Sequence, residues 1–437
     1  MQQIPAKNVV GIINRTLNLV DARLIDHGGR VADFVHQALC RKGGYGLRQR
    51  RDICLLALLH DIGAYKTEEI DRMVYFETVD IWAHSIYGYL FAKYISPLSE
   101  LAPALFFHHA SLSDLEHLHP SYHDIAQMLH IADRMDILSQ ASGKLERQNF
   151  LRHFNRRRGV KYRSDLVDLF DDALFASDAE RVPFDSLFAD MSFSRNQLNA
   201  YLTMMVLSID FRSPQTVTHT MTATTISRVL AELVGLGREA AGDVHLGTML
   251  HDLGKQGIPP EILESTERLS PKAMEVMRGH VRLTEDILAG QVDEAVVNIA
   301  ARHHERLDGS GYPRGLTAAE LDIGERLVAV ADIMSALLGV RSYKDAYPVE
   351  KVLRIIGEVR DQGKIDADVV AAATRNFPHI LVEVEKTSES TMNMYGHLNQ
   401  EFERFRKLTG SLRNKGSDWV LEEALSWGGT DRIEREE

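Results

Sequence analysis

Two short stretches of the chain have nearly the same sequence: residues 58–63 are LLHDIG and residues 249–254 are MLHDLG. In each, an adjacent His–Asp pair follows an apolar run. Apolar residues near these pairs recur at helical spacing, as in Leu56, Leu59 and Ile62, whereas the period-2 alternation of strands is scarce. The sequence therefore predicts an all-α protein.

A longer set of polar residues is repeated around the two pairs, in the order His, His-Asp, His, His-His, Asp. The first copy consists of His27, His60, Asp61, His84, His108, His109 and Asp133. The second copy consists of His219, His251, Asp252, His280, His303, His304 and Asp332. Scattered core or surface histidines could explain single members, but a matched set in the same order indicates a duplication. We therefore expect two tandem helical domains.

The expected domain limits follow from composition. Residues 165–193 mix acidic and aromatic side chains around Pro183, and an apolar helix over 198–211 follows them. We assign residues 1–192 to the first domain, 193–385 to the second, and 386–437 to a charged helical extension. A basic segment, 147–163, includes three consecutive arginines and is most simply a solvated helix face. The alternative is an arm that contacts phosphate or mediates dimerisation.

The composition limits the classes of partner. Fifty basic and 62 acidic residues give a net charge of −12, which argues against a DNA or RNA polymer as ligand. Two cysteines, Cys40 and Cys54, cannot build a thiolate metal site or a disulfide framework. The amino terminus has no signal-peptide pattern, and the longest apolar run, 53–59, is too short to cross a bilayer. These features predict a cytoplasmic protein without membrane association; a homodimer is compatible with its apolar helix faces.

Imidazoles and carboxylates in one set are typical ligands of iron, manganese and zinc. In the second copy the donors divide into His219, His251 and Asp332 for one ion, His280, His303 and His304 for another, and Asp252 as the bridge. Two ions about 3.5–4 Å apart clamp a phosphoryl group for in-line displacement and supply a nucleophile at neutral pH. Their charge would also compensate for the acidity of the chain. Lys255 is expected one helical turn after His251, within reach of a phosphate oxygen.

The second copy, from about Thr216 to Glu358, resembles the HD-GYP branch of the HD superfamily of metal-dependent phosphohydrolases. The resemblance rests on five segments: 251–259 (HDLGKQGIP), 279–280 (GH), 303–313 (HHERLDGSGYP), 331–332 (AD) and 341–344 (RSYK). Gly309 and Gly311 are expected to allow a tight turn with unusual backbone dihedrals in the signature loop, and Pro313 to stiffen its exit.

The resemblance implies a helical bundle with two divalent ions, iron or manganese. It implies hydrolysis of a cyclic dinucleotide, cyclic di-GMP or 3′3′-cyclic GMP-AMP, to a linear 5′-phosphorylated dinucleotide. Asp252 and Lys255 would be the catalytic residues. Substrate contacts would come from Lys255, Asp308, Gly311, Tyr312, Pro313, Arg341 and Lys344. Some members carry a Glu for a third ion where this chain has Gln215, so two ions are expected.

The first copy resembles only the broader HD superfamily. It keeps all seven donor residues, but Ala110 follows its His pair and Ala64 stands at the lysine position. Seven such residues would be unfavourable in a core without metal, so metal ions are expected here too. The favoured interpretation is a phosphatase, or 5′-nucleotidase, acting on the linear product. The alternatives are a domain that binds nucleotide or metal and regulates its neighbour, and a structural relic.

Two other functions compete with the phosphodiesterase. A receptor would bind the cyclic dinucleotide without cleaving it, but the complete donor set and Lys255 argue against this. An HD nucleotidase would act on free nucleotides; the Gly311–Pro313 loop argues against it for the second copy only. Because histidines must be neutral to bind metal, activity is expected to fall in acid.

Overall fold

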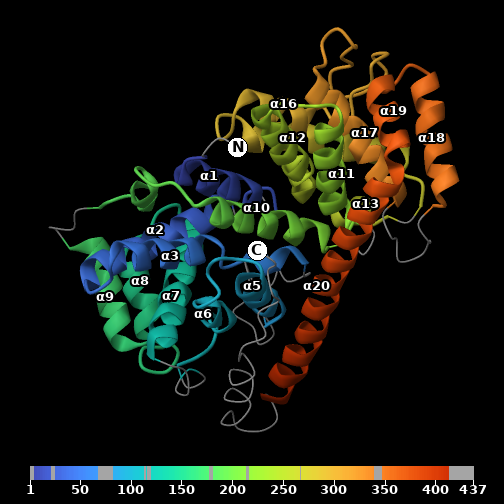
Figure 1. Cartoon of the computed structure of the whole chain (residues 1–437). Coiled ribbons are helices and arrows are strands. Elements are labelled where there is room, and N and C mark those ends of the chain that lie inside the picture. Colours follow the sequence, from blue (N-terminus) through green and yellow to red (C-terminus); the bar gives the residue numbers. More distant parts are fainter. Residues whose placement is uncertain are drawn as a thin grey trace. The chain divides into compact units, whose positions relative to one another are not determined.

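The structure, a computed structural model, describes residues 4–20, 25–66, 82–112, 115, 120–176, 181–212, 216–265, 267–338 and 347–412. It is 71% helical, and its described residues contain no β-strand, only isolated bridges such as that between Asp308 and Thr317 (Figure 1). The predicted all-α class is therefore confirmed. Among the described helices, none combines the length and the apolar character needed to span a bilayer.

The chain packs as two compact units. The amino-terminal unit comprises Pro5–Met204 with the residues from Leu398 onward, and the carboxyl-terminal unit comprises Met205–His397 with the residues up to Ile4. The predicted limit at 192/193 falls just before helix α10 (Arg195–Asp210), and the one at 385/386 falls inside helix α20 (Phe377–Leu412). As limits of functional domains, they remain predictions.

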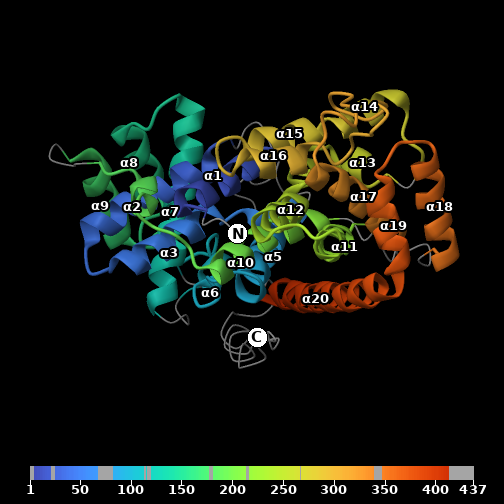
Figure 2. The same cartoon turned by 45° about the horizontal axis from the view of Figure 1, so that its top comes forward.

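The carboxyl-terminal unit is a bundle built around α11 (His219–Leu233) and α17 (Ile323–Leu338), which pack against each other. Its other elements are α12 (Arg238–Leu250), η5 (Leu253–Gly257), α13 (Pro260–Leu263), α14 (Pro271–Arg278), α15 (His280–Leu288), α16 (Glu294–Ala301), α18 (Val349–Asp361), α19 (Ala367–Arg375) and the start of α20 (Figure 2). Apolar residues at helical spacing, among them Ile226, Leu230 and Val330, form its core, so burial of apolar surface fixes these helices.

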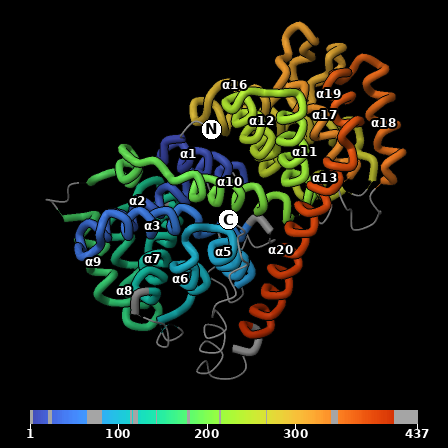
Figure 3. The backbone as a smooth tube through the Cα atoms, in the orientation of Figure 1, coloured from blue at the N-terminus to red at the C-terminus, as the bar shows by residue number. Residues whose placement is uncertain are grey.

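The amino-terminal unit is a second helical bundle. Its elements are α1 (Ala6–Leu17), α2 (His27–Lys42), α3 (Leu47–Leu58), η2 (Ile62–Lys66), α5 (Trp82–Tyr94), α6 (Ala102–Phe106), α7 (Pro120–Ser142), α8 (Arg147–Asn155), α9 (Ser164–Phe175), η4 (Phe184–Phe188) and most of α10 (Figure 3). The end of α20 also belongs to it. There, Phe402 stacks on Tyr87 with ring centroids 4.1 Å apart, and Phe405 lies against Phe106 at 5.3 Å.

Both units use the same close backbone contact behind the His–Asp pair. Gly254 of η5 packs on α15, where a Cβ would overlap the carbonyl oxygen of His280 and lie 2.7 Å from the amide nitrogen of Thr284. Gly63 of η2 packs on α5 in the same way, against the carbonyl of His84 and 2.5 Å from the amide nitrogen of Gly88. Only glycine permits this approach, which fixes each pair relative to the next histidine.

We expect Gly254→Ala to destabilise the carboxyl-terminal unit by roughly 3 kcal/mol, at the upper end of overpacking costs, because the new methyl meets backbone rather than a movable side chain. Urea unfolding followed by circular dichroism measures this effect. The matched control is Gly396→Ala on α20, where a Cβ meets nothing within 4 Å. That change should be neutral or stabilise by up to about 1 kcal/mol. Equal stability of the two variants would contradict the close-contact argument.

Candidate metal centres

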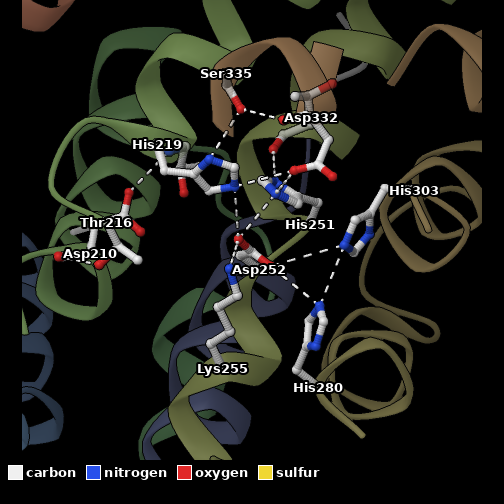
Figure 4. A network of polar contacts seen from close by, with 12 residues as sticks. Asp210, Thr216, His219, His251, Asp252, Lys255, His280, His303, Asp332 and Ser335 are labelled. Atoms are coloured by element: carbon white, nitrogen blue, oxygen red, sulfur yellow. Dashed lines mark hydrogen bonds and ion pairs between the residues drawn. The ribbon is translucent and has the colours of Figure 1, made fainter. Parts of the chain in front are cut away.

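The seven predicted donors of the second copy converge in the carboxyl-terminal unit, and all of them except His304 are labelled in Figure 4. His219 begins α11, the His251–Asp252 pair follows α12, and Asp332 lies within α17. His280 begins α15, and the His303–His304 pair follows α16. Donor atoms of His219, His251 and Asp252 lie within 4.8 Å of one another, as do those of His280, His303 and His304.

Asp252 stands between the two groups. Its Oδ2 is 3.4 Å from Nε2 of His219 and 3.1 Å from Nε2 of His251. Its Oδ1 is 3.4 Å from Nε2 of His280 and 4.0 Å from Nε2 of His303. One carboxylate oxygen therefore faces each group, which is the arrangement a bridging ligand requires.

Asp332 completes the ring of donors. Its Oδ1 lies 3.3 Å from Nε2 of His219, and its Oδ2 lies 3.6 Å from Nδ1 of His304. The structure thus brings together every residue of the predicted set, and their assignment as metal ligands remains a prediction.

The backbone fixes which ring nitrogen of three histidines is bare. Nδ1 of His251, His280 and His303 each lies 2.6 Å from the carbonyl oxygen three residues earlier. A carbonyl can only accept, so Nδ1 carries the proton and Nε2 presents a lone pair. The Nε2 atoms of His280 and His303 face each other at 3.4 Å. Two lone pairs at this distance repel, whereas a cation beside both would be stabilised, so these residues fit a divalent metal ion.

Burial keeps the second donor group neutral. It lowers the pKa of His280 to about 4, that of His304 to about 3, and that of His303 well below its usual range. Burial would raise the pKa of Asp252, but His251 and Lys255 hold it well below its ordinary value. The centre therefore combines bare imidazoles with an ionised carboxylate.

His219 differs from the other donors. Burial lowers its pKa, but hydrogen bonds to Asp252 and Asp332 outweigh burial and raise the pKa to about 9. Its Nδ1 lies 3.0 Å from Oγ of Ser335, whose hydroxyl donates to the carbonyl of Asp332. Ser335 was not predicted, although it stands one helical turn after Asp332, where a supporting partner could have been sought.

Lys255 lies beside the bridging carboxylate, with Nζ 2.5 Å from Oδ2 of Asp252. The expectation that it follows His251 on one face of an α-helix is wrong. Helix α12 ends at Leu250, and Lys255 sits in the 3₁₀-helix η5, because Gly254 must approach α15 closely. The tighter turn directs the ammonium group to Asp252 at i,i+3.

The predicted signature loop lies against the second donor group. The centroid of the Tyr312 ring lies 4.7 Å from that of the His304 ring. The Arg278 guanidinium lies over the same Tyr312 ring, 4.8 Å from its centroid. Gly309 has a φ of +77°, as the turn requires. Gly311 is needed for a different reason, since a Cβ there would lie 2.5 Å from Cα of Glu305. The Tyr312–Pro313 peptide bond is cis.

Two polar residues that were not predicted organise this region. Glu305 is buried, and its carboxylate accepts from the amides of Arg314 at 2.7 Å and Leu316 at 2.9 Å, which anchors the exit of the loop. The Thr284 hydroxyl donates to the carbonyl of His251 at 3.0 Å and accepts from the amide of Gly254 at 2.9 Å. Both use side chains to satisfy backbone groups in turns, which no spacing rule singles out.

The remaining predicted substrate contacts are only partly described. Asp308 is exposed, and its carboxylate accepts from the amide and hydroxyl of Ser310, which lowers its pKa. Arg341 and Lys344 lie outside the described residues, as does Gln215. Asp210, which no motif singled out, is buried near His219, and burial raises its pKa to about 6.

The donors of the first copy converge in the amino-terminal unit with matching contacts. Asp61 Oδ2 faces Nε2 of His27 at 3.5 Å and of His60 at 3.3 Å, and its Oδ1 faces Nε2 of His84 at 3.8 Å. The donor groups are His27, His60 and Asp133, and Asp61, His84, His108 and His109. Each contact corresponds to one in the carboxyl-terminal unit, so this set also fits divalent metal.

The amino-terminal centre differs in what supports its first histidine. His27 Nδ1 lies 2.7 Å from Oδ2 of Asp136, and Asp136 is also held by Arg30 through contacts of 2.5 and 2.9 Å. Burial lowers the pKa of His27, but Asp136 and Asp61 raise it to about 10. A carboxylate here replaces the hydroxyl of Ser335 in the other unit and makes the imidazole a more basic ligand.

Known proteins resemble this chain in sequence and in fold. Residues 204–369 match the model of the HD domain family. The chain is 25% identical over 390 residues to 3′3′-cGAMP-specific phosphodiesterase 1 of Vibrio cholerae, covering 83% of this chain and 90% of that relative. It is 32% identical over 188 residues to the cyclic di-GMP phosphodiesterase response regulator RpfG of Xanthomonas campestris, covering 41% of this chain and half of RpfG. In fold it is similar to the V. cholerae cyclic GMP-AMP phosphodiesterase V-cGAP3, with a TM-score of 0.53, 16% identity, and coverage of 86% and 98%.

Helical donors around paired His–Asp residues and the family match define an HD-domain protein, a class that binds divalent metal. Within that class, the relatives that the chain resembles are named cyclic di-GMP and 3′3′-cGAMP phosphodiesterases, in agreement with the predicted resemblance to the HD-GYP family. That the amino-terminal unit is a second HD domain without the signature loop remains a prediction.

Metal binding to the carboxyl-terminal centre should release about one proton at pH 7.5. The pKa of His219 is about 9 without metal, above its usual 6.5, so the ring is protonated there and must lose its proton to bind. The release should therefore vanish as pH rises through 9. Calorimetric titration with Mn²⁺ in buffers of different ionisation enthalpy measures it. His219→Ala should lower the count by about one, while the exposed His379→Ala should not; an unchanged count in His219→Ala would contradict the assignment.

Proposed function

We propose that the carboxyl-terminal unit is a metal-dependent phosphodiesterase that opens a cyclic dinucleotide to a linear 5′-phosphorylated dinucleotide. The observation that carries this is the position of Lys255, whose ammonium lies 2.5 Å from the carboxylate that faces both donor groups. A phosphodiester held by a metal ion in each donor group would lie beside Asp252, and there its oxygens would contact the Lys255 ammonium. The relatives named as cyclic di-GMP and 3′3′-cGAMP phosphodiesterases support the substrate class.

The side chains divide the chemical work. Bound divalent ions would neutralise phosphoryl charge and activate water. The chain's own part is to present bare Nε2 atoms from His251, His280 and His303 without reorganisation, since the backbone already holds each ring. Lys255 stays protonated: burial lowers its pKa, but Asp252 raises it above the usual value.

Tyr312 supplies a platform beside the second group. Burial raises the pKa of its hydroxyl, so the group remains a hydrogen-bond donor at neutral pH. Its ring is the aromatic surface proposed to contact a purine, and the Arg278 guanidinium lies over that ring, 4.8 Å from the centroid. Asp308, Gly311, Pro313, Arg341 and Lys344 remain proposed substrate contacts. Cyclic di-GMP and 3′3′-cyclic GMP-AMP both fit this description, and iron and manganese both fit the donors.

We expect Lys255→Gln to lower kcat for ring opening by about 10²–10³-fold, the usual effect of removing one electrostatic stabiliser, while metal content stays unchanged. His251→Ala should abolish turnover and lower metal content together. Chromatography of linear product from each cyclic dinucleotide, with metal analysis, measures both. Lys272→Gln, which removes an exposed lysine of α14, is the matched control.

The result that would contradict this function is a Lys255→Gln rate equal to that of Lys272→Gln. If the intact, metal-loaded chain bound a cyclic dinucleotide but turned over neither one, the chain would instead be a receptor.

A second activity is proposed for the amino-terminal unit: a phosphomonoesterase that removes the 5′-phosphate of the linear product. The observation in its favour is the complete second donor set, with contacts that match the first set atom for atom around Asp61. Nε2 atoms of His84 and His108 face each other at 3.4 Å, and those of His27 and His60 at 3.3 Å. A metal-free relic would have no reason to keep these ring nitrogens gathered around one carboxylate, and a regulator would not need all seven donors.

His60→Ala and Asp61→Ala should each slow phosphate release from the linear dinucleotide by more than the roughly 10–100-fold that loss of a mere supporting contact costs. Ring opening should remain at the rate of the parent chain, since His251 and its partners are untouched. Phosphate release and ring opening are measured on the same preparations, with His379→Ala as control and thermal melts to verify folding. Unchanged phosphate release in folded His60→Ala and Asp61→Ala would rule this activity out.

A further inference from the structure

A group of cations stands at one end of the amino-terminal donor set. Arg134 follows Asp133 on α7 and is only 8% exposed. Its Nε and Nη2 donate to Oδ2 of Asp133 at 3.0 and 2.8 Å, so the carboxylate fixes the plane of the guanidinium. The same carboxylate faces Nε2 of His27 and Nδ1 of His109. A buried arginine is thus fixed directly beside the proposed metal ligands.

A second cation, Lys161, comes from the connection between α8 and α9. Burial, together with the positive charges of Arg134 and Arg157, lowers the pKa of Lys161 to about 8. Asp133 acts on Lys161 in the opposite sense, so all four groups lie within electrostatic reach. The half-buried ammonium is therefore part of the charge distribution around Asp133.

Hydrogen bonds from Gln127 hold this connection close to α7. The Gln127 side-chain amide donates to the carbonyl of Lys161 at 3.3 Å and accepts from the amide of Arg163 at 3.0 Å. Between them, Tyr162 is fully buried, and its ring lies 5.0 Å from that of His130. Gln127 lies on the same helix as Arg134, so one helix positions both cations.

Two buried ring nitrogens without a hydrogen-bond partner among the described residues lie in the same region. His130 lies 5.7 Å, ring to ring, from the proposed ligand His109. The two nitrogens are Nδ1 of His130 and Nε2 of His109. Unsatisfied buried nitrogens beside fixed cations are what a polar ligand would complete.

The carboxyl-terminal unit has apolar residues at the corresponding positions. By the repeat, Ile333 replaces Arg134 and Ala329 replaces His130. There, the second histidine of the pair, His304, instead meets the ring of Tyr312. The two units therefore share a donor set but differ in the side chains beside it. Side chains in this position would contact the substrate, so the difference would change which phosphate ester each unit binds.

We propose that Arg134 and Lys161 form a phosphate-binding site that selects a terminal phosphate monoester for the amino-terminal centre. This rests on the phosphomonoesterase proposed for that unit. A phosphate monoester carries between about 1.5 and 2 negative charges at pH 7 and three terminal oxygens, whereas a phosphodiester carries one charge. Two fixed cations beside the metal ligands match the additional charge, and Arg134 and Lys161 would contact the oxygens that the metal ions do not hold.

The test uses the full chain, loaded with Mn²⁺, in a His251→Ala background that removes the carboxyl-terminal centre. Inorganic phosphate is the probe, and its binding is measured by calorimetry. Lys161→Gln should weaken phosphate binding about tenfold, the usual effect of losing one charge-assisted hydrogen bond, and Lys161→Arg should restore most of it. Arg134→Lys, which keeps the charge but loses the fork held by Asp133, should also weaken binding. The control, Arg147→Gln, removes an exposed arginine paired with Asp171 in the same unit and should change nothing.

In the parent chain with both centres intact, Lys161→Gln should raise KM for phosphate release from the linear dinucleotide more than it lowers kcat, and leave ring opening unchanged. Phosphate binding that is indifferent to Lys161→Gln and Arg134→Lys in folded protein overturns the site, even if phosphate release persists. Binding that depends on both residues supports it, and if phosphate release is then absent, only the phosphomonoesterase is lost. No phosphate binding by the parent overturns the site.

Discussion

The centre of each unit depends on one recurring hydrogen bond, from Nδ1 of a histidine to the carbonyl three residues earlier. The last carbonyls of a helix have no partner within it, and a histidine just beyond the end can satisfy one. His60, His108, His251, His280 and His303 all do this, with nitrogen–oxygen distances of 2.5–2.7 Å. The bond fixes both the tautomer and the orientation of the ring. Where several helices end close together, the unprotonated Nε2 atoms of these histidines therefore lie close together. The positions of helix ends therefore determine the geometry of the donors.

Because of this dependence, we expect the structure to be least tolerant of substitution at the turns between the donor helices. Gly254 and Gly63 allow the His–Asp turn to lie on the backbone of the next donor helix, and Thr284 ties the same turn through its hydroxyl. Around that shared frame the two units diverge in what touches the donors. Lys255 corresponds to Ala64, and Ser335 to Asp136. A conserved frame with different neighbours lets one metal-binding arrangement serve two kinds of phosphate ester, as we propose.

The sequence predicted the all-α class, the similarity to cyclic dinucleotide phosphodiesterases and the residues that converge, because metal donors are few in type and their order is repeated. Prediction from the sequence failed where local backbone geometry determines the position of a side chain. The helix assumed to carry Lys255 ends at Leu250, since the glycine contact forces a tighter turn. Glu305 and Gln127 were missed because each hydrogen-bonds backbone groups of a later loop, and no periodicity marks such a partner. Gly311 was expected to need unusual dihedrals, but it is required by the nearness of Glu305.

Charge gives a physical reason for pairing the two proposed activities in one chain. Opening a cyclic dinucleotide converts a phosphodiester into a monoester, which gains up to one negative charge at pH 7. Beside its donors, the carboxyl-terminal centre presents Lys255, already bonded to Asp252, and the aromatic Tyr312. The amino-terminal centre presents Arg134 and Lys161. The additional charge is therefore worth more at the second centre than at the first, so the change in substrate charge itself would favour transfer of the product from one kind of site to the other.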